Sequence, residues 1–545
     1  MARRPTRPAT PQISGSTTIP APTGGLNAIS PISNMDESDA IIMRNFFPEP
    51  FGVRVRKGYI EHATGLDGPV SSILLYNGQD GTNKVFSVDM TQVMDVTIPG
   101  DYANGTPICH STNPWWQSIQ IANPTGTHMI AFNGVDDGIV YSSDGVHRLV
   151  AGDGIAAYTW SGIDPKKLVL PIVHQSRLWA VEVDSTKAWY LPSQQIYGVA
   201  KFFDFGANFQ RGGFLQALVV YTQDSGYGPD DYIVAISSAG ECVIYKGIDP
   251  EGADTWALVG VFYIGATFTR RCTARFGGDV AILTQYGLIT VGSITKPTEY
   301  SVLDNALSQK IQYLISEVVI EGSYRQGWTV VFHPAANMMI VNVPGVVPEQ
   351  NFQLAYNTLT KAWCQFSGML AYCWKSSTDV LFFAGTRPGT KPPSLRNTST
   401  AGVVYRAWEG YLDSVSLAGT NGVPVKAECQ QAFSYFKLPG ASKHFKMFRP
   451  TFLYDGKFDF QAGANMNFDF ATVPPPASFN TSNFGVWNQS LWDDTDVWSG
   501  GSQSDKQWIS IVGIGYAAAV RLAVTTSSNT VWVSTDWLME KGGVV

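Results

Sequence analysis

Short apolar runs separated by turns recur along most of the chain. The runs contain about five or six apolar residues and begin near Lys84, His128, Arg177, Asp231, Asp279, Met338 and Asp379. Their starts are roughly 40 to 60 residues apart, which is the range of a four-stranded propeller blade. No run follows the 3.6-residue period of stacked helices. The pattern therefore predicts an all-β protein built on an irregular β-propeller of about six blades.

Turn residues between the runs support hairpins rather than crossover connections. They include Asn133-Gly134, Asp144-Gly145, Gly240 and Tyr286-Gly287. Glycine and asparagine adopt the positive φ that tight hairpin turns require. One short helix is predicted at about residues 36–46, because Ser33 and Asp36 resemble a capping box and Pro48 would stop the helix.

The chain divides into three predicted parts. Residues 1–25 combine arginine with many prolines and predict an extended N-terminal arm. Residues 26–410 hold the recurring runs and predict the propeller. The character changes near Tyr411, after which strands are expected at 425–436, 445–454, 458–470, 508–512, 520–525 and 531–539. Residues 411–545 are therefore predicted to form a β-sandwich-like platform that completes or docks the propeller.

Composition narrows the classes of partner and compartment. The 545 residues are 44% hydrophobic and 15% charged, with a formal net charge of −7. This charge argues against a surface that grips nucleic acid, because phosphate binding needs clustered Lys and Arg. The N-terminus lacks a secretory signal, and the apolar stretch at 512–524 contains Arg521 and is too short to span a membrane. We therefore expect synthesis in the cytosol.

Residue types for catalysis or metal binding do not occur at the spacing that such chemistry needs. The six cysteines form no C-x-x-C pair, and the seven histidines form no H-x-x-x-H pair. We expect the cysteines to be free core thiols. Acidic turns such as Asp136-Asp137-Gly138 lack the spacing of a calcium loop and are expected to be solvated. The sequence thus predicts no catalytic residue, no cofactor and no metal.

Three groups of residues are candidates for contacts with partners. The arm could strap onto a neighbouring subunit or a phosphate, or could have no role. The basic cluster near Pro439-Gly440 could be a docking surface or a solvated strand face. The tryptophan-rich loop could stack on sugar or DNA, or pack against a neighbouring subunit. The candidate residues are Arg3, Arg4 and Arg7, then Lys443, Lys446 and Arg449, and finally Trp487, Trp492 and Trp498.

Several segments of the chain resemble a family of structural proteins of short-tailed bacteriophages and prophages, the tail nozzle or tail tubular protein B family. The resemblance covers most of the chain, and its motifs are structural, so it transfers no catalytic residue. The segments are 22–27 (PTGGLN), 45–50 (NFFPEP), 55–58 (VRKG), 203–206 (FDFG), 236–250, 255–260 (TWALVG), 404–405, 410–411, 446–450 and 540–543 (EKGG).

The resemblance implies a place in the virion tail. It implies a ring of six copies below an adaptor ring, contacts with tail fibre or spike proteins, and a gated channel through which viral DNA passes without sequence-specific binding. Six chains of −7 would carry about −42, which disfavours adhesion of DNA to the channel wall. The alternatives are a propeller-type carbohydrate-binding or depolymerising tail protein, and a tail plug or hub that stabilises packaged DNA.

Overall fold

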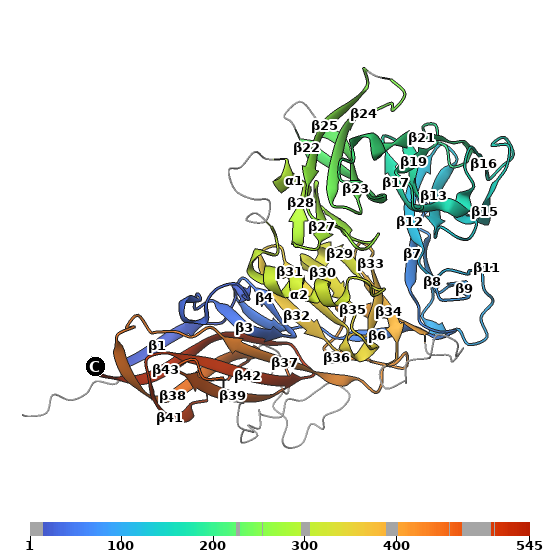
Figure 1. The fold of residues 1–545 in the computed structure, drawn as a ribbon. Helices are drawn as coiled ribbons and strands as arrows, with labels where there is room; N and C mark the ends of the chain where they lie inside the picture. Colours follow the sequence, from blue (N-terminus) through green and yellow to red (C-terminus); the bar gives the residue numbers. More distant parts are fainter. Residues whose placement is uncertain are drawn as a thin grey trace, which may run out of the picture. The chain divides into compact units, whose positions relative to one another are not determined.

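The computed structural model describes residues 15–224, 229–252, 254–295, 306–387, 402–456, 458–470, 503–505 and 507–544. The chain forms two compact units. The propeller unit comprises Gly58–Thr358 and Phe366–Val423, and the sandwich unit comprises Met1–Lys57, Leu359–Gln365 and Pro424–Val545. Strands account for 55% of the residues and helices for 7%, so the predicted all-β class is confirmed (Figure 1).

Five sheets of the propeller unit have four or more strands. The first contains β7 (Ser72–Asn77), β8 (Asn83–Val88), β9 (Gln92–Asp95) and β11 (Cys109–His110). The second contains β12 (Gln117–Asn123), β13 (Gly126–Phe132), β14 (Gly138–Ser142), β15 (Gly145–Ala151), β16 (Thr159–Ser161) and β20 (Gly198–Val199). The third contains β17 (Leu168–His174), β18 (Arg177–Glu182), β19 (Lys187–Tyr190) and β21 (Lys201–Asp204). The fourth contains β22 (Leu215–Asp224), β23 (Pro229–Ser237), β24 (Glu241–Gly247) and β25 (Trp256–Tyr263).

The fifth sheet closes the ring of sheets. It contains β10 (Gly100–Asp101), β6 (Tyr59–Leu66), β35 (Gly402–Ala407), β34 (Leu381–Thr386) and β33 (Ala371–Ser376). In this sheet β6, which opens the unit, pairs antiparallel with β35 near its end. An early and a late strand of the propeller unit therefore share one sheet.

Two smaller ladders complete the ring. They contain β26 (Thr273–Phe276), β27 (Asp279–Thr284) and β28 (Gly287–Thr290), and β29 (Thr329–His333), β30 (Met338–Val343) and β31 (Phe352–Asn357). Going round the ring, β22 contacts β27, β26 contacts β29, and β29 contacts β33. The propeller arrangement has five blades rather than the predicted six. The ladder β26–β28 has three strands, whereas β31 continues into β32 (Ala362–Ser367) within a larger sheet.

Neighbouring sheets of the ring pack through apolar cores. Trp179 of β18 stacks on Trp256 of β25 with ring centroids 5.8 Å apart, and Tyr190 packs on Trp179 at 4.6 Å. A second core joins β13 and β14 to β17 and β18 around Trp160. Aromatic side chains thus fill the space between blades, and their burial stabilises the ring by roughly 1.5–3 kcal/mol for each large side chain.

Helices are few and short. They are α1 (Val291–Ile294), α2 (Gln312–Gly322) and the 3-10 turns Ile32–Asn34, Pro165–Lys167, Phe205–Asn208, Gln309–Ile311, Pro334–Ala336 and Pro348–Gln350. The remaining short strand of the propeller unit is β36 (Leu412–Asp413). No helix within the described ranges has the length and apolar character needed to cross a bilayer.

Two sheets form the sandwich unit. One contains β1 (Gly15–Pro20), β4 (Phe46–Glu49), β5 (Gly52–Val55), β38 (Ala441–Tyr454), β40 (Gln503–Asp505), β41 (Ile509–Gly515) and β43 (Thr530–Val544). The other contains β2 (Gly25–Leu26), β3 (Asp39–Arg44), β37 (Val423–Gln431), β42 (Ala518–Thr526) and β39 (Phe458–Met466), and β32 (Ala362–Ser367) joins it where Gln365 pairs with Arg44.

Aromatic residues fill the space between these two sheets. The ring centroid of Phe452 on β38 lies 5.1 Å from that of Phe460 and 5.2 Å from that of Phe458, both on β39. Trp537 of β43 is buried among Phe436, Phe445 and Phe448 of the same unit. The predicted β-sandwich is thus present.

The boundaries of the predicted parts need correction. Residues 15–20 of the expected arm form β1, whose six residues pair with Ser534–Met539 of β43. The helix expected at 36–46 is strand β3, because Asp39–Arg44 find hydrogen-bonding partners on β37. Residues up to Lys57 belong to the sandwich unit rather than to the propeller, since both of these strands complete its sheets.

All six cysteines are free, as predicted. Five are buried and Cys109 is partly exposed. Burial raises the pKa of Cys242 and of Cys272 to about 12. These two thiols therefore stay protonated at neutral pH and behave as small apolar core side chains.

Candidate functional site

A cavity of about 470 Å³ lies at the centre of the propeller ring. Its wall is made by one strand from each sheet of the ring, because the inner strands β7, β12, β17, β22, β26, β29 and β33 all contribute side chains. The volume is within the range of roughly 300–1,000 Å³ that is typical of small-molecule sites. The ring therefore surrounds a space of the size of a small-molecule site.

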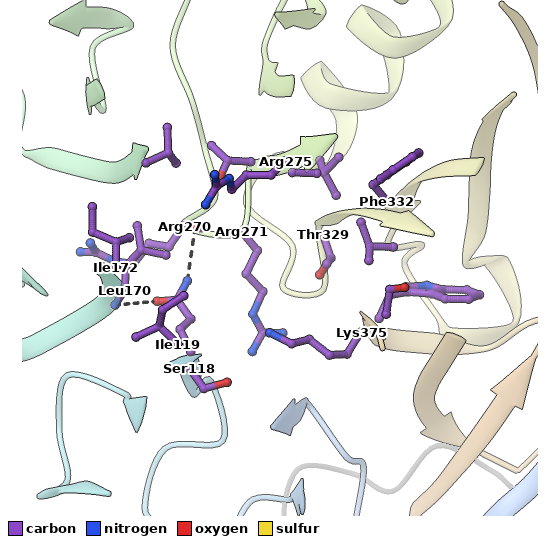
Figure 2. A pocket seen from close by; sticks show the side chains of 18 of the residues that line it. Ser118, Ile119, Leu170, Ile172, Arg270, Arg271, Arg275, Thr329, Phe332 and Lys375 are labelled. Atoms are coloured by element: carbon purple, nitrogen blue, oxygen red, sulfur yellow. Dashed lines mark hydrogen bonds between the residues drawn. The ribbon is translucent and has the colours of Figure 1, made fainter. Parts of the chain in front are cut away.

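Four cationic side chains line this cavity (Figure 2). Arg270 and Arg271 belong to the turn before β26, Arg275 lies on β26, and Lys375 lies on β33. Of the described residues that line the cavity, none is Asp or Glu. The cavity thus has a positive wall although the chain as a whole is acidic.

Arg271 is fixed in place by neutral partners on two other sheets. Its Nη1 donates to the carbonyl oxygen of Ser71 at 2.8 Å, and its Nη2 donates to the carbonyl oxygen of Trp116 at 3.0 Å and to Ser72 Oγ. The guanidinium centre lies 5.0 Å from the Trp115 ring centroid. Arg271 therefore ties the β26 turn to the sheets of β7 and β12 while it keeps its positive charge uncompensated.

Arg270 has one buried donor without a partner. Its guanidinium centre lies 5.6 Å from the Phe214 ring centroid, and Nη1 is buried without a hydrogen-bond partner in the described part of the chain. Gln117 fixes the backbone here, since its Nε2 donates to the Arg270 carbonyl at 3.3 Å and its Oε1 accepts from the Leu170 amide at 3.1 Å (Figure 2). An unused donor on a fixed backbone is ready for a ligand acceptor.

The electrostatics of the cavity follow from burial and from like charges. Burial lowers the pKa of Arg270, of Arg271 and of Lys375. The Arg271 charge lowers the pKa of Lys375 further. No described carboxylate forms an ion pair with any of the four cations, so the site would gain from an anion.

A second cavity of about 420 Å³ shares Arg270 and Arg271 with the first. Its wall adds the aromatic side chains of Trp115, Phe214, Phe268 and Trp328. Phe268 and Trp328 meet edge to face with ring centroids 5.0 Å apart. The two arginines thus form part of the wall of both spaces.

Another cavity, of about 600 Å³, holds the nearest approach to a hydrolytic arrangement. His128 Nδ1 lies 2.5 Å from Ser142 Oγ, and His128 Nε2 lies 3.0 Å from Asn123 Oδ1. Only 3% of Ser142 is exposed. Asn123 Oδ1 also accepts from the Thr125 amide at 2.9 Å, within the turn between β12 and β13. This network accordingly fixes a hairpin turn.

The basic cluster predicted in the sandwich unit does not act as one surface. Lys443 is buried, and its Nζ donates to the carbonyl oxygens of Leu438 at 2.6 Å, Ala441 at 3.0 Å and Tyr516 at 2.7 Å. All three ammonium hydrogens are used inside the unit. The expectation that Lys443 serves a docking surface is therefore wrong.

The two other basic residues of this cluster lie on β38 opposite acidic residues of β43. Lys446 pairs with Glu540, and Arg449 Nη2 donates to Asp536 Oδ2 at 2.6 Å. The Arg449 guanidinium centre also lies 4.6 Å from the Trp508 ring centroid. Cross-strand ion pairs therefore balance most of the charge of these two residues.

The remaining predicted contact residues lie outside the described residues. These are Arg3, Arg4, Arg7, Trp487, Trp492 and Trp498. Within the part of the chain that the structure describes, no group of three or more His, Cys, Asp or Glu side chains could hold a metal ion.

Sequence reasoning missed the cationic cavity. Its signal is the adjacent pair Arg270-Arg271, which precedes the strand that contains Arg275. Lys375 follows more than a hundred residues later, on another sheet. Only the closure of the ring brings these cations to one space, so no local spacing marks them as a site.

Comparisons with known proteins give distant structural matches alone. No protein-family model and no curated protein matches the chain. A crystal structure of BBS1N in complex with ARL6DN matches at 9% identity with a TM-score of 0.37, covering 65% of this chain and 98% of that one. The Swd1 β-propeller domain of Myceliophteria thermophila matches at 10% identity with a TM-score of 0.36, covering 65% and 99%. Raptor of Chaetomium thermophilum matches at 8% identity with a TM-score of 0.37, covering 66% and 29%.

Proposed function

We propose that the chain is a structural subunit of the tail of a short-tailed bacteriophage, where six copies form the nozzle below an adaptor ring. The observation that carries the proposal is the position of the residues that resemble the nozzle family. Segments 22–27, 45–50 and 55–57 lie in the sandwich unit, where their polar side chains connect its strands. These motif residues therefore serve the fold.

Asn27 shows this use at the first segment. Its Nδ2 donates to Asp39 Oδ2 at 2.7 Å, and its Oδ1 accepts from the amides of Ile29 at 3.1 Å and Ser30 at 3.0 Å. Gly25 beside it has a φ of +79°, and a Cβ there would lie 2.6 Å from the carbonyl oxygen of Trp363. Glycine is therefore required for this close approach of two backbones.

Asn45 and Arg56 show the same use at the other two segments. Asn45 Nδ2 donates to the carbonyl oxygen of Lys426 at 2.8 Å. The Asn45 backbone amide donates to the carbonyl oxygen of Gln365 at 2.7 Å. Asn45 Oδ1 accepts from Nε of the buried Arg56 at 2.9 Å. One asparagine thus joins three stretches of chain that are distant in sequence.

The size of the propeller cavity bears on where DNA could pass. A space of about 470 Å³ suits a small molecule and is far too small for a duplex. In the proposed nozzle the DNA path therefore lies between copies of the chain rather than through one propeller. The net charge of −7 per copy makes a wall of such copies unattractive to phosphate.

Native mass spectrometry of the full chain, alone and mixed with the tail adaptor protein, tests this function. We expect a complex with six copies of the chain on the adaptor ring, seen as a closed ring by electron microscopy. A folded chain that remains a single copy in the presence of the adaptor would contradict the proposal. Digestion of a capsular polysaccharide by the purified chain would instead favour a depolymerising tail protein.

A further inference from the structure

We propose that the cavity at the centre of the propeller ring binds a small oxyanion, a phosphate or carboxylate ligand, between Arg271 and Lys375. The proposal goes beyond the nozzle role and does not depend on it. The basis is a pair of cations that face one shared space from different sheets, without a described carboxylate to balance them.

Arg271 and Lys375 approach each other across the cavity (Figure 2). Arg271 comes from the turn before β26, and Lys375 comes from β33. Among the described residues, no hydrogen bond or ion pair involves the Lys375 ammonium, and the proximity of the Arg271 charge disfavours its protonation. An anion between the two side chains would favour the charged form of Lys375 beside Arg271.

Arg270 lines both this cavity and the second one, and its guanidinium centre lies 5.6 Å from the ring centroid of Phe214, which lines the second cavity. Its Nη1 is buried and has no hydrogen-bond partner among the described residues. Buried polar atoms are nearly always hydrogen-bonded in folded proteins, so this donor would gain from an acceptor. A phosphate or carboxylate group carries several acceptor oxygens, which can serve guanidinium and ammonium donors together.

Preorganisation favours binding at this place. Hydrogen bonds to Ser71, Ser72 and Trp116 fix the Arg271 side chain before any ligand arrives. Gln117 holds the backbone of Arg270 in the same way. A ligand therefore does not have to order the Arg271 side chain, and the loss of that side chain's entropy on binding is small. The cavity volume of about 470 Å³ limits the ligand to a small molecule.

The test is isothermal titration calorimetry on the full chain at neutral pH and constant ionic strength. The probes are inorganic phosphate, pyrophosphate and citrate. Binding of the first two would indicate a phosphate ligand, and binding of citrate would indicate a carboxylate ligand. We expect one site per chain for at least one probe. Lys375→Gln should weaken that binding about tenfold, the value of one charge-assisted hydrogen bond.

Two further variants keep the test decisive. Lys375→Arg retains the positive charge and should retain binding even if Lys375→Gln folds poorly. Lys201→Gln removes an exposed lysine that pairs with Glu251 on the outside of the ring, and should leave binding unchanged. Two results would overturn the proposal. One is the absence of binding by all three probes at millimolar concentration, and the other is equal affinity in folded Lys375→Gln and the unmodified chain.

Discussion

At the scale of single residues, Lys443 and Arg271 are two cations that are held by neutral oxygens rather than by carboxylates. Lys443 donates to three carbonyl oxygens and Arg271 donates to two carbonyls and a hydroxyl. A buried donor of this kind leaves its acceptors unsatisfied when it is removed. These side chains should therefore matter more for stability than the surface ion pairs.

Lys443→Met tests this difference in the sandwich unit. The variant keeps most of the side-chain volume but leaves three carbonyl oxygens without their donor, so we expect the free energy of unfolding to fall by about 3 kcal/mol or more. Urea denaturation measures the change. Lys446→Met is the matched control, because Lys446 is partly exposed and its one ion pair among the described residues is with Glu540; its loss should cost at most about 1 kcal/mol. Equal losses would contradict the interpretation.

Four buried histidines predict how stability depends on pH. Burial lowers the pKa of His62, His128, His174 and His333 below the ordinary value of 6.5. Below pH 6.5 the unfolded chain therefore binds more protons than the folded chain, and stability falls as the pH drops from 6.5 toward the lowered values.

His174 is a suitable residue for measuring this effect. Its Nε2 lies 3.1 Å from the carbonyl oxygen of Gly247, while Nδ1 is buried without a partner among the described residues. We expect the melting temperature to fall between pH 7.5 and 5.5, and to fall less in His174→Gln. A melting temperature of the unmodified chain that stays constant over this range would refute the assignment.

Residue roles were only partly predictable from the sequence. The alternation along β38 indicated a strand with basic positions, but it gave Lys443 and Lys446 the same role. They differ because the acceptors of Lys443 lie in the turn before β38 and at Tyr516, which approach only in the folded unit. The cations of the propeller cavity were missed for the same reason.

At the scale of elements, hairpins were predictable because their signals are local. Gly240 and Gly287 stand in turns at φ of +91° and +132°, as expected from their place between apolar runs. Strand β3 was mistaken for a helix because its capping pattern is local while its partner β37 lies far along the chain. Tertiary pairing thus overrode a weak local preference.

The closure of the ring by β6 gives a prediction for a single core side chain. Phe382 of β34 is buried and meets His62 of β6 edge to face at 5.2 Å. Phe382→Ala should lower the free energy of unfolding by about 3–5 kcal/mol through lost burial and a cavity. Chemical denaturation measures this. Phe202→Ala removes a half-exposed ring on β21 and should cost clearly less, so a comparable loss would count against the closure.

At the scale of the whole molecule, the net negative charge predicts weak binding to DNA. We expect the full chain to show no measurable binding to labelled duplex DNA by fluorescence anisotropy in physiological salt, because few phosphates can be neutralised. A basic DNA-binding protein in the same buffer serves as the positive control. Micromolar binding that weakens as salt is added would show that a cationic surface reaches the duplex.

The two-unit architecture was predicted in kind but not in its boundaries. Composition and repeat spacing indicated a propeller followed by a sandwich. They could not show that residues 15–57 complete the sandwich, because strand pairing between distant segments leaves no periodic signal in either one. The number of blades was misjudged for a related reason, since short ladders and full blades begin with similar apolar runs.

The pairing of β1 with β43 sets an order of events during synthesis. Strand Gly15–Pro20 leaves the ribosome early, whereas its partner from Thr530 onward is translated about 500 residues later. At ordinary elongation rates this delay is roughly 25–100 s. All strands of the ring emerge within that interval, so the propeller can fold first while the early strand waits unpaired, in need of protection from aggregation.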